Sequence, residues 1–158
     1  MEFKRIQGDF SVCKVQDYTG VCLNDLYCFT GRSEEENSLI CQTQMVPANT
    51  ISREDGYKAF RIEGVLDFSL IGILARISAL LAEEKIGILA VSTFNTDYFF
   101  VKANDEMHAL NKLASSGYTV KSGDDYGDYF LNRTASDILG EYSEHRDEWV
   151  YLSPTPQK

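Results

Sequence analysis

The chain has 158 residues, of which 44% are apolar and 25% are charged, and its formal net charge is −9. This composition predicts a folded protein of one domain or two very small ones, and an acidic balance without a basic stripe argues against nucleic acid or an anionic membrane as a partner. No stretch approaches the roughly 18 apolar residues of a membrane span, and no apolar run of a signal peptide follows Met1–Arg5, so a cytoplasmic protein is expected.

Short strands without a full helix are predicted for the first third of the chain. The apolar pattern indicates strands over residues 3–6, 10–15, 26–30 and 38–43. We expect a break between the first two strands at Gly8 and Asp9, and we interpret residues 48–56 as a linker. The pattern therefore predicts a small, reduced unit over residues 1–54.

All four cysteines lie in this first third, at Cys13, Cys22, Cys28 and Cys41. Their spacing contains no CxxC pair, and the two histidines, His108 and His145, lie far away in the sequence. We therefore expect no metal site and no other cofactor. The cysteines are interpreted as small buried thiols in a reduced protein.

A complete strand–helix pattern is predicted between residues 57 and 121. The expected elements are a strand at 57–65, a helix from Leu70 to Glu84, a central strand at 88–93, a returning strand at 98–101, a helix capped by Asn104 and a last strand at 118–120. This β-α-β-β-α-β order predicts an α+β fold of the ferredoxin-like type, an antiparallel sheet with helices on one face. Phe99 and Phe100 point to opposite faces, so the second face is expected to be covered.

Residues 122–158 are interpreted as an acidic extension. A helix over 134–149 is predicted to pack onto the body of the protein, and Pro154 and Pro156 indicate a frayed end beyond it.

Two sequence stretches, RIEGVLDFSLIGILA and AVSTFNTDYFFVK, resemble proteins built from paired small ACT domains. They are similar to short bacterial ACT-domain proteins and to the ACT pair of the animal cytosolic arginine sensors. The resemblance implies tandem ferredoxin-like units, the N-terminal one reduced and the second complete over 57–121. It also implies a non-catalytic regulatory module that binds an amino acid at the seam between units and forms a homodimer.

The resemblance places the ligand between the start of the first helix and the hairpin. The positions that match the family are Gly72, Ile73, Ser92, Thr93, Asn95 and Asp97. The arginine sensors carry an acid just before this helix start, where this chain has Leu70, so the resemblance does not carry arginine over as the ligand.

Elementary electrostatics adds a pocket hypothesis. Asp67 or Ser69 is predicted as the N-cap of the helix, and both are included in the candidate site. Free amides at the helix start suit the carboxylate of an amino acid, and Asp97 suits its ammonium group. Two alternatives stay open: Asp97 caps the hairpin turn, and Gly72 only permits close packing.

Two other classes of function are considered. An enzyme is not expected, because neither histidine has a partner suited to acid–base catalysis and no phosphate-binding glycine loop occurs. The alternative to ligand binding is an assembly module that uses a sheet face or edge and binds no small molecule.

Overall fold

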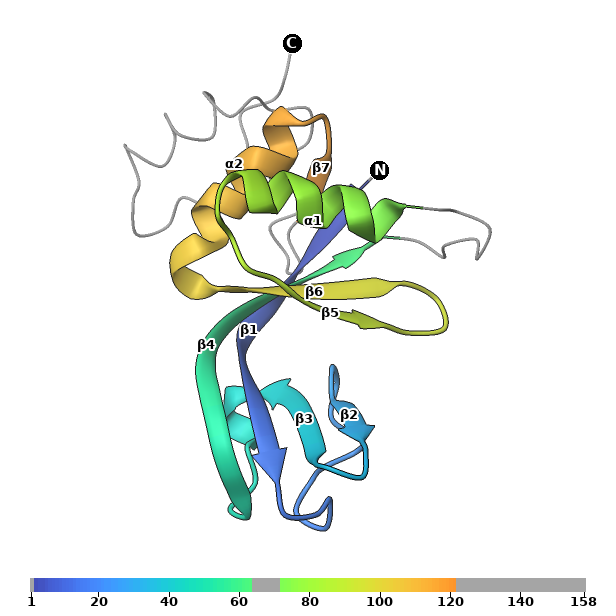
Figure 1. Ribbon diagram of the computed structural model, residues 1–158, viewed down its shortest axis with the longest axis vertical. Coiled ribbons are helices and arrows are strands. Elements are labelled where there is room, and N and C mark those ends of the chain that lie inside the picture. The colour runs from blue at the N-terminus through green and yellow to red at the C-terminus, as the bar shows by residue number, and fades with distance from the viewer. Residues whose placement is uncertain (1, 64–71, 122–158) are drawn as a thin grey trace. The chain divides into compact units, whose positions relative to one another are not determined.

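The structure is a computed structural model that describes residues 2–63 and 72–121. The chain divides into two compact units. The first, here called the helical unit, comprises the residues up to Gln7 and those from Ala59 onward; the second, the strand unit, comprises Gly8–Lys58. Two long strands, β1 (Glu2–Val15) and β4 (Thr50–Ile62), supply residues to both units (Figure 1).

This division does not follow the proposed boundaries of 1–54 and 57–121. Residues 2–7 lie in the helical unit, and residues 55–58 lie in the strand unit. The acidic extension, 122–158, and its predicted helix lie outside the described residues. The division into tandem ACT-like units stays a prediction.

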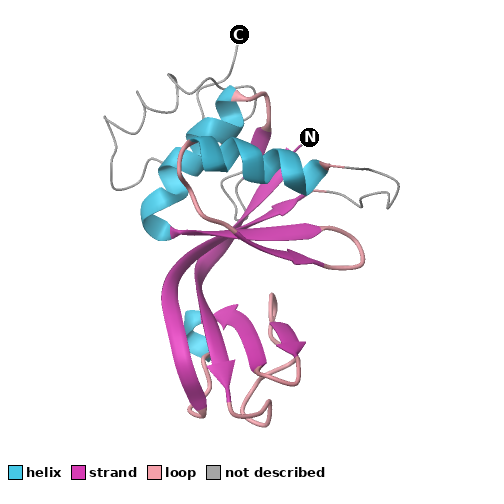
Figure 2. Cartoon of the chain, viewed as in Figure 1, coloured by secondary structure: helices cyan, strands magenta, loops and turns pink. Residues whose placement is uncertain are grey.

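The helical unit contains two helices and a mixed sheet (Figure 2). Its elements after β4 are α1 (Ile73–Glu83), β5 (Leu89–Ser92), β6 (Asp97–Lys102), α2 (Glu106–Ser115) and β7 (Thr119–Lys121). The strands follow the order β7-β1-β4-β6-β5. This arrangement is compatible with the predicted ferredoxin-like fold, but the sheet is not wholly antiparallel: β1 runs parallel to β7, with Glu2 opposite Thr119.

The hydrophobic core of this unit lies between the helices and one face of the sheet. Ile77 and Leu81 of α1 and Leu110 and Leu113 of α2 are fully buried, as the spacing of apolar residues by three and four positions predicts. The sheet supplies the buried residues Phe3, Phe60, Ile62, Phe99, Val101 and Val120.

Three phenylalanine rings form a row in this core, with Phe99 of β6 in contact with both of the others. Phe60 of β4 stacks on Phe99 of β6 with the ring centroids 5.2 Å apart and the planes at 15°. Phe3 of β1 meets Phe99 edge-on, with the centroids 5.5 Å apart. Both geometries are favourable for aromatic pairs, so the row joins β1, β4 and β6 through side chains as well as through backbone.

The second face of the sheet is also buried where large apolar side chains occur. Phe100 is 0% exposed, and Ile6 and Ala59, which also lie outside the helix-facing core cluster, are nearly as buried. The expectation of a covered second face is therefore confirmed for these positions.

Three strand predictions are wrong in their extent or position. The break expected at Gly8 is absent, because Gly8 takes a positive φ of 107° and the strand continues through it as β1. The expected linker over 48–56 is the start of β4, which begins at Thr50. The strand expected to be central, β5, ends the described strand order, and its residues Ala90 and Ser92 are exposed.

The starts of both helices also differ from the prediction. Gly72 is the N-cap of α1 and has a left-handed backbone with φ 80°, so the helix begins at Ile73 rather than at Leu70. A Cβ atom built on Gly72 would meet no atom within 4 Å, so close packing does not explain this glycine; its backbone angle does. Asn104 does not cap α2: it lies in the 3₁₀ turn η2 (Ala103–Asp105), and no side chain caps either element.

The strand unit contains four strands and no α-helix. It comprises the second part of β1, β2 (Phe29–Arg32), β3 (Asn37–Gln42), the 3₁₀ turn η1 (Thr43–Met45) and the first part of β4. β3 pairs antiparallel with both β1 and β2. Its small core consists of Cys13, Val15, Leu39 and Cys41, so cysteines supply half of the fully buried cluster.

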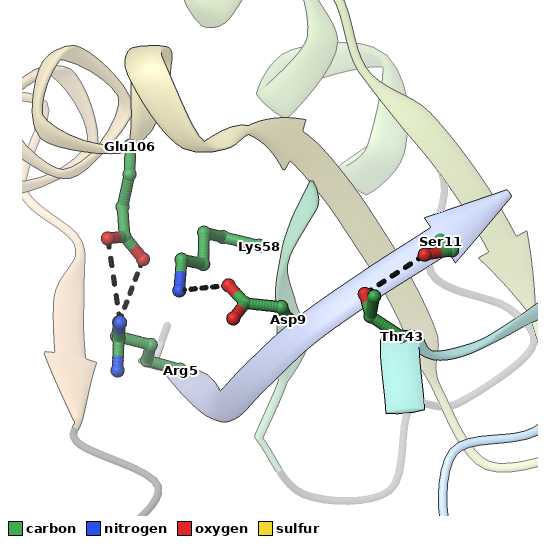
Figure 3. Close-up of polar contacts among 6 residues, drawn as sticks. All are labelled: Arg5, Asp9, Ser11, Thr43, Lys58 and Glu106. Carbon is green, nitrogen blue, oxygen red and sulfur yellow. Dashed lines mark hydrogen bonds and ion pairs between the residues drawn. The ribbon is translucent and has the colours of Figure 1, made fainter. Parts of the chain in front are cut away.

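Polar contacts complete the strand unit (Figure 3). The buried Ser11 hydroxyl lies 2.9 Å from the hydroxyl of Thr43 and donates to the Asp55 carboxylate at 2.6 Å. Lys58 Nζ lies 2.7 Å from Asp9 Oδ1, which joins β4 to β1.

No helix in the described part of the chain is long and apolar enough to cross a membrane.

A buried ion pair joins β1 to α2 within the helical unit. Arg5 Nε lies 2.8 Å from Glu106 Oε2, and the side chains are only 3% and 12% exposed (Figure 3). Glu106 is also the first residue of α2, where a negative charge interacts favourably with the helix dipole. This pair attaches the start of α2 to β1, the strand that pairs with β7.

We predict that Glu106→Gln lowers the free energy of unfolding by about 3 kcal/mol, because it removes the carboxylate charge that lies 2.8 Å from the buried Arg5 guanidinium. Urea unfolding measures the change. The matched control is Glu83→Gln, which removes a carboxylate that is 60% exposed and 2.6 Å from Lys112 Nζ. The control substitution should lower the free energy of unfolding by less than about 1 kcal/mol. Equal effects from the two substitutions would contradict a stabilising role for the buried pair.

The four cysteines differ in exposure and all are free thiols. Cys13 and Cys41 are buried as expected, but Cys22 is exposed and Cys28 is intermediate. Burial raises the pKa of Cys41 to about 12 and also raises the pKa of Cys13 and of Cys28. The expectation of buried thiols is therefore wrong for Cys22, which lies in a loop outside the small core.

We predict that iodoacetamide at about pH 8 modifies Cys22 well before Cys41, because the thiolate is the reactive form. Mass spectrometry of briefly labelled protein measures the order, and labelling in urea should remove the difference. The raised pKa of Cys41 also lowers the stability of the protein at alkaline pH. The pKa of this thiol is 9.0 in the unfolded chain and about 12 in the folded protein, so the free energy of unfolding falls as pH rises between these values. Equal labelling rates in the native protein would contradict the burial of Cys41.

Candidate functional site

The tip of the β5–β6 hairpin is closed by threonine hydrogen bonds. Ser92 and Asp97 form the last cross-strand pair of the hairpin. Beyond this pair, the Thr93 amide donates to the Thr96 carbonyl at 2.8 Å, and the Thr93 hydroxyl donates to the same carbonyl at 2.9 Å. The tip therefore has a defined backbone conformation despite its exposure.

A buried hydroxyl attaches this tip to the end of β4. Thr96 is 7% exposed, and its Oγ1 donates to the Ile62 carbonyl at 2.8 Å. A buried hydrogen bond of this kind is costly to lose, since the carbonyl would have no water to replace the donor. Residues 61–63 and 93–96 are consequently held beside one another.

A cavity of about 430 Å³ lies at this junction. Its lining residues come from the end of β4, the hairpin tip and the start of β6: Arg61, Ile62, Glu63, Thr93, Phe94, Asn95, Thr96 and Tyr98. Ile62 belongs to the core under the helices, and side chains alternate along a strand, so Arg61 and Glu63 project to the sheet face opposite the helices.

The cavity wall carries charges of both signs. Arg61 Nε lies 3.3 Å from Glu63 Oε2, and the two side chains are 28% and 29% exposed. Two aromatic residues, Phe94 and Tyr98, supply apolar surface nearby, and Phe94 is 81% exposed. The wall can therefore contact a small ligand that combines opposite charges with an apolar part.

The proposed site residues separate into three groups. Thr93 and Asn95 line the cavity. Ser92 and Asp97 lie at the base of the hairpin tip, paired with each other, and neither is a lining residue.

The remaining candidates lie at or before the start of α1. Gly72 is its N-cap, and Ile73 packs against the core under the helices. Neither residue lines the cavity. Asp67 and Ser69 lie outside the described residues. The pairing of helix amides with Asp97 across a ligand stays a prediction.

Arg61, Glu63, Phe94 and Tyr98 were not among the sequence candidates. In the sequence, Arg61 and Glu63 alternate with apolar residues in the manner of any solvent-facing strand edge. The only local signal was a base and an acid two positions apart at a strand end, which is common on exposed strands.

The described ranges, 2–63 and 72–121, contain one histidine, His108. No cluster of three or more His, Cys, Asp or Glu side chains there could hold a metal ion. His108 is exposed on α2, away from the cavity lining.

Comparison with protein-family models finds one domain match within the chain. Residues 52–115 match the model of the ACT domain. This range includes all the lining residues of the cavity. A search of the curated proteins finds no match to this chain.

Solved structures support the fold. A protein from Agobacterium tumefaciens has a TM-score of 0.70 and 22% identity, with 78% of this chain and 93% of that chain covered. A Vibrio cholerae protein of unknown function, described as a possible transport protein, has a TM-score of 0.55 and 18% identity, with 70% of this chain and 85% of that chain covered. At these identities the likeness concerns the fold alone. The family match itself covers residues 52–115.

Proposed function

We propose that the chain is a non-catalytic regulatory module that binds an amino acid in the cavity at the hairpin tip. ACT domains are in general regulatory modules that bind small molecules, and the matched range contains the cavity. Since a fold alone does not determine a function, the proposal depends on one observation of this chain. That observation is a guanidinium and a carboxylate 3.3 Å apart in the wall of a cavity of about 430 Å³.

The volume and composition of the cavity suit such a ligand. Small-molecule pockets are usually about 300–1,000 Å³, with apolar walls and a few polar groups. An amino acid carries a carboxylate and an ammonium group on one carbon atom, so it needs opposite charges close together. The wall supplies these charges, and Thr93 and Asn95 supply further hydrogen-bonding groups.

A second candidate function is assembly, for which the sheet edge provides a specific observation. β5 ends the described strand order, its four residues LAVS carry no charge, and Phe94 at the adjoining tip is 81% exposed. Edge strands without charges or prolines can pair with another chain. We propose a homodimer through this edge, which is compatible with ligand binding and would be the whole function if no ligand binds.

We predict that at least one standard amino acid raises the melting temperature of the ligand-free protein. A ligand at about 100 times its Kd stabilises the folded state by roughly 2.7 kcal/mol, which raises Tm by several degrees. Differential scanning fluorimetry with each amino acid measures the shift. Asn95→Trp should remove it by filling the cavity.

The matched control for this experiment is Asn104→Trp. Asn104 is exposed in η2, beyond the opposite end of β6 from the hairpin tip. The Asn104→Trp variant should keep the rise in melting temperature that the ligand causes. If no amino acid shifts the melting temperature of protein refolded free of ligand, the sensor proposal fails and assembly remains.

We predict that the protein is a dimer at micromolar concentration and that Ala90→Lys makes it monomeric, because lysine on an edge strand opposes strand pairing. Sedimentation velocity measures the state. Ala103→Lys, also at an exposed position but in η2, should leave the dimer intact. A monomeric wild-type protein under these conditions would refute the edge-paired dimer.

A further inference from the structure

We infer that the ligand is an amino acid with an uncharged side chain, and that Arg61 and Glu63 bind its two charged ends. Arg61 would receive the α-carboxylate and Glu63 the α-ammonium group. This inference rests on the proposed function and deepens it, because it assigns the class of ligand and the residues that select it.

The position of the two side chains supports this assignment. They flank Ile62 near the end of β4, project to the same sheet face and lie with Nε and Oε2 3.3 Å apart. The neighbouring Ile62 carbonyl is bound by Thr96, so the backbone that presents both charges is anchored to the hairpin tip. This hydrogen bond therefore fixes the backbone that carries both charged side chains.

The chemistry of each group matches one end of an amino acid. A guanidinium has five N–H donors in a plane, which suits the two oxygens of a carboxylate. A carboxylate accepts several hydrogen bonds and suits the three donors of an ammonium group. The Arg61–Glu63 pair is about 30% exposed, and such pairs are weak. The loss of this one contact is therefore small when a ligand takes its place.

The remaining wall determines the class of side chain. Among the residues that the structure describes, the lining residues other than Arg61 and Glu63 are Ile62, Thr93, Phe94, Asn95, Thr96 and Tyr98, and none of these is charged at neutral pH. The side chain of arginine, lysine, aspartate or glutamate would therefore find no further countercharge among these described residues, so any desolvation of its charge against this wall would be uncompensated. An apolar or aromatic side chain could instead cover the exposed ring of Phe94.

This assignment differs from the one suggested by the sequence. The sequence pattern matches the helix amides to the carboxylate and Asp97 to the ammonium group. The cavity lining contains neither Gly72, Ile73 nor Asp97, whereas both charges of the present assignment lie in its wall.

Isothermal titration calorimetry with the full chain tests the class of ligand. We expect leucine, methionine or phenylalanine to bind at least tenfold more tightly than arginine, lysine, aspartate or glutamate. Preferred binding of a charged amino acid would overturn this inference while leaving the sensor proposal intact. Failure of every amino acid to bind would instead overturn the proposed function, and this inference with it.

Modified ligands test the two ends separately. For the best neutral amino acid, we expect its methyl ester, which lacks the carboxylate, and its N-acetyl form, which lacks the ammonium group, each to bind at least tenfold more weakly to the wild-type protein. Arg61→Gln should bind the amino acid and its methyl ester about equally. Glu63→Gln should bind the amino acid and its N-acetyl form about equally.

Matched controls are Arg76→Gln and Glu84→Gln, exposed positions in and directly after α1 that are not among the lining residues. Both should keep the wild-type sensitivity to each modification. Unchanged sensitivity in Arg61→Gln and Glu63→Gln would overturn the assignment of these residues. The wild-type comparison of modified ligands needs no variant, so it remains decisive if a substitution impairs folding.

Discussion

The stack of Phe60 on Phe99 sets the alignment on which the helical unit depends. It places β4 and β6 side by side under the two helices. Ile62 follows Phe60 by two residues on β4, and Thr96 precedes Phe99 by three residues. The Thr96 hydroxyl donates a hydrogen bond to the Ile62 carbonyl. The aromatic stack and this hydrogen bond thus belong to one register. A slip of one residue would reverse the face of every side chain along the strand, so the same constraint that buries the core also presents Arg61 and Glu63 at the cavity.

The core and the cavity use opposite faces of the same short piece of β4. Phe60 and Ile62 are fully buried under the helices, whereas Arg61 and Glu63 retain about 30% exposure on the other face. This separation allows binding groups to be placed on a rigid strand without putting charge into the core. It also means that substitutions at 61 and 63 test binding with little effect on packing, which is the usual advantage of sites supported by regular elements.

The sequence predicted the elements well where their signal is local. Apolar spacing found both helices, and alternation found most strands of the helical unit, because these patterns follow from the geometry of a single element. It failed where the answer depends on distant pairing. Nothing near Gly8 shows that β1 continues, and nothing in LAVS shows that β5 is an edge. For the site, Thr93 and Asn95 could be predicted from the turn, but Arg61 and Glu63 resemble an ordinary wet strand face until the hairpin tip is placed beside them.

The insertion of the first strand between β4 and β7 has a consequence for the order of folding. The pairing of Glu2 with Thr119 joins positions 117 residues apart, while the hairpin of β5 and β6 closes over a few residues. Closing such a long loop is entropically costly and slows folding. On the ribosome, residues 2–4 can pair with the end of β4 once that strand has emerged, but their pairing with β7 must wait until almost the whole described chain has been made. Of the described strands, β7 should therefore be the last to dock, and until then this edge of β1 has no strand beside it.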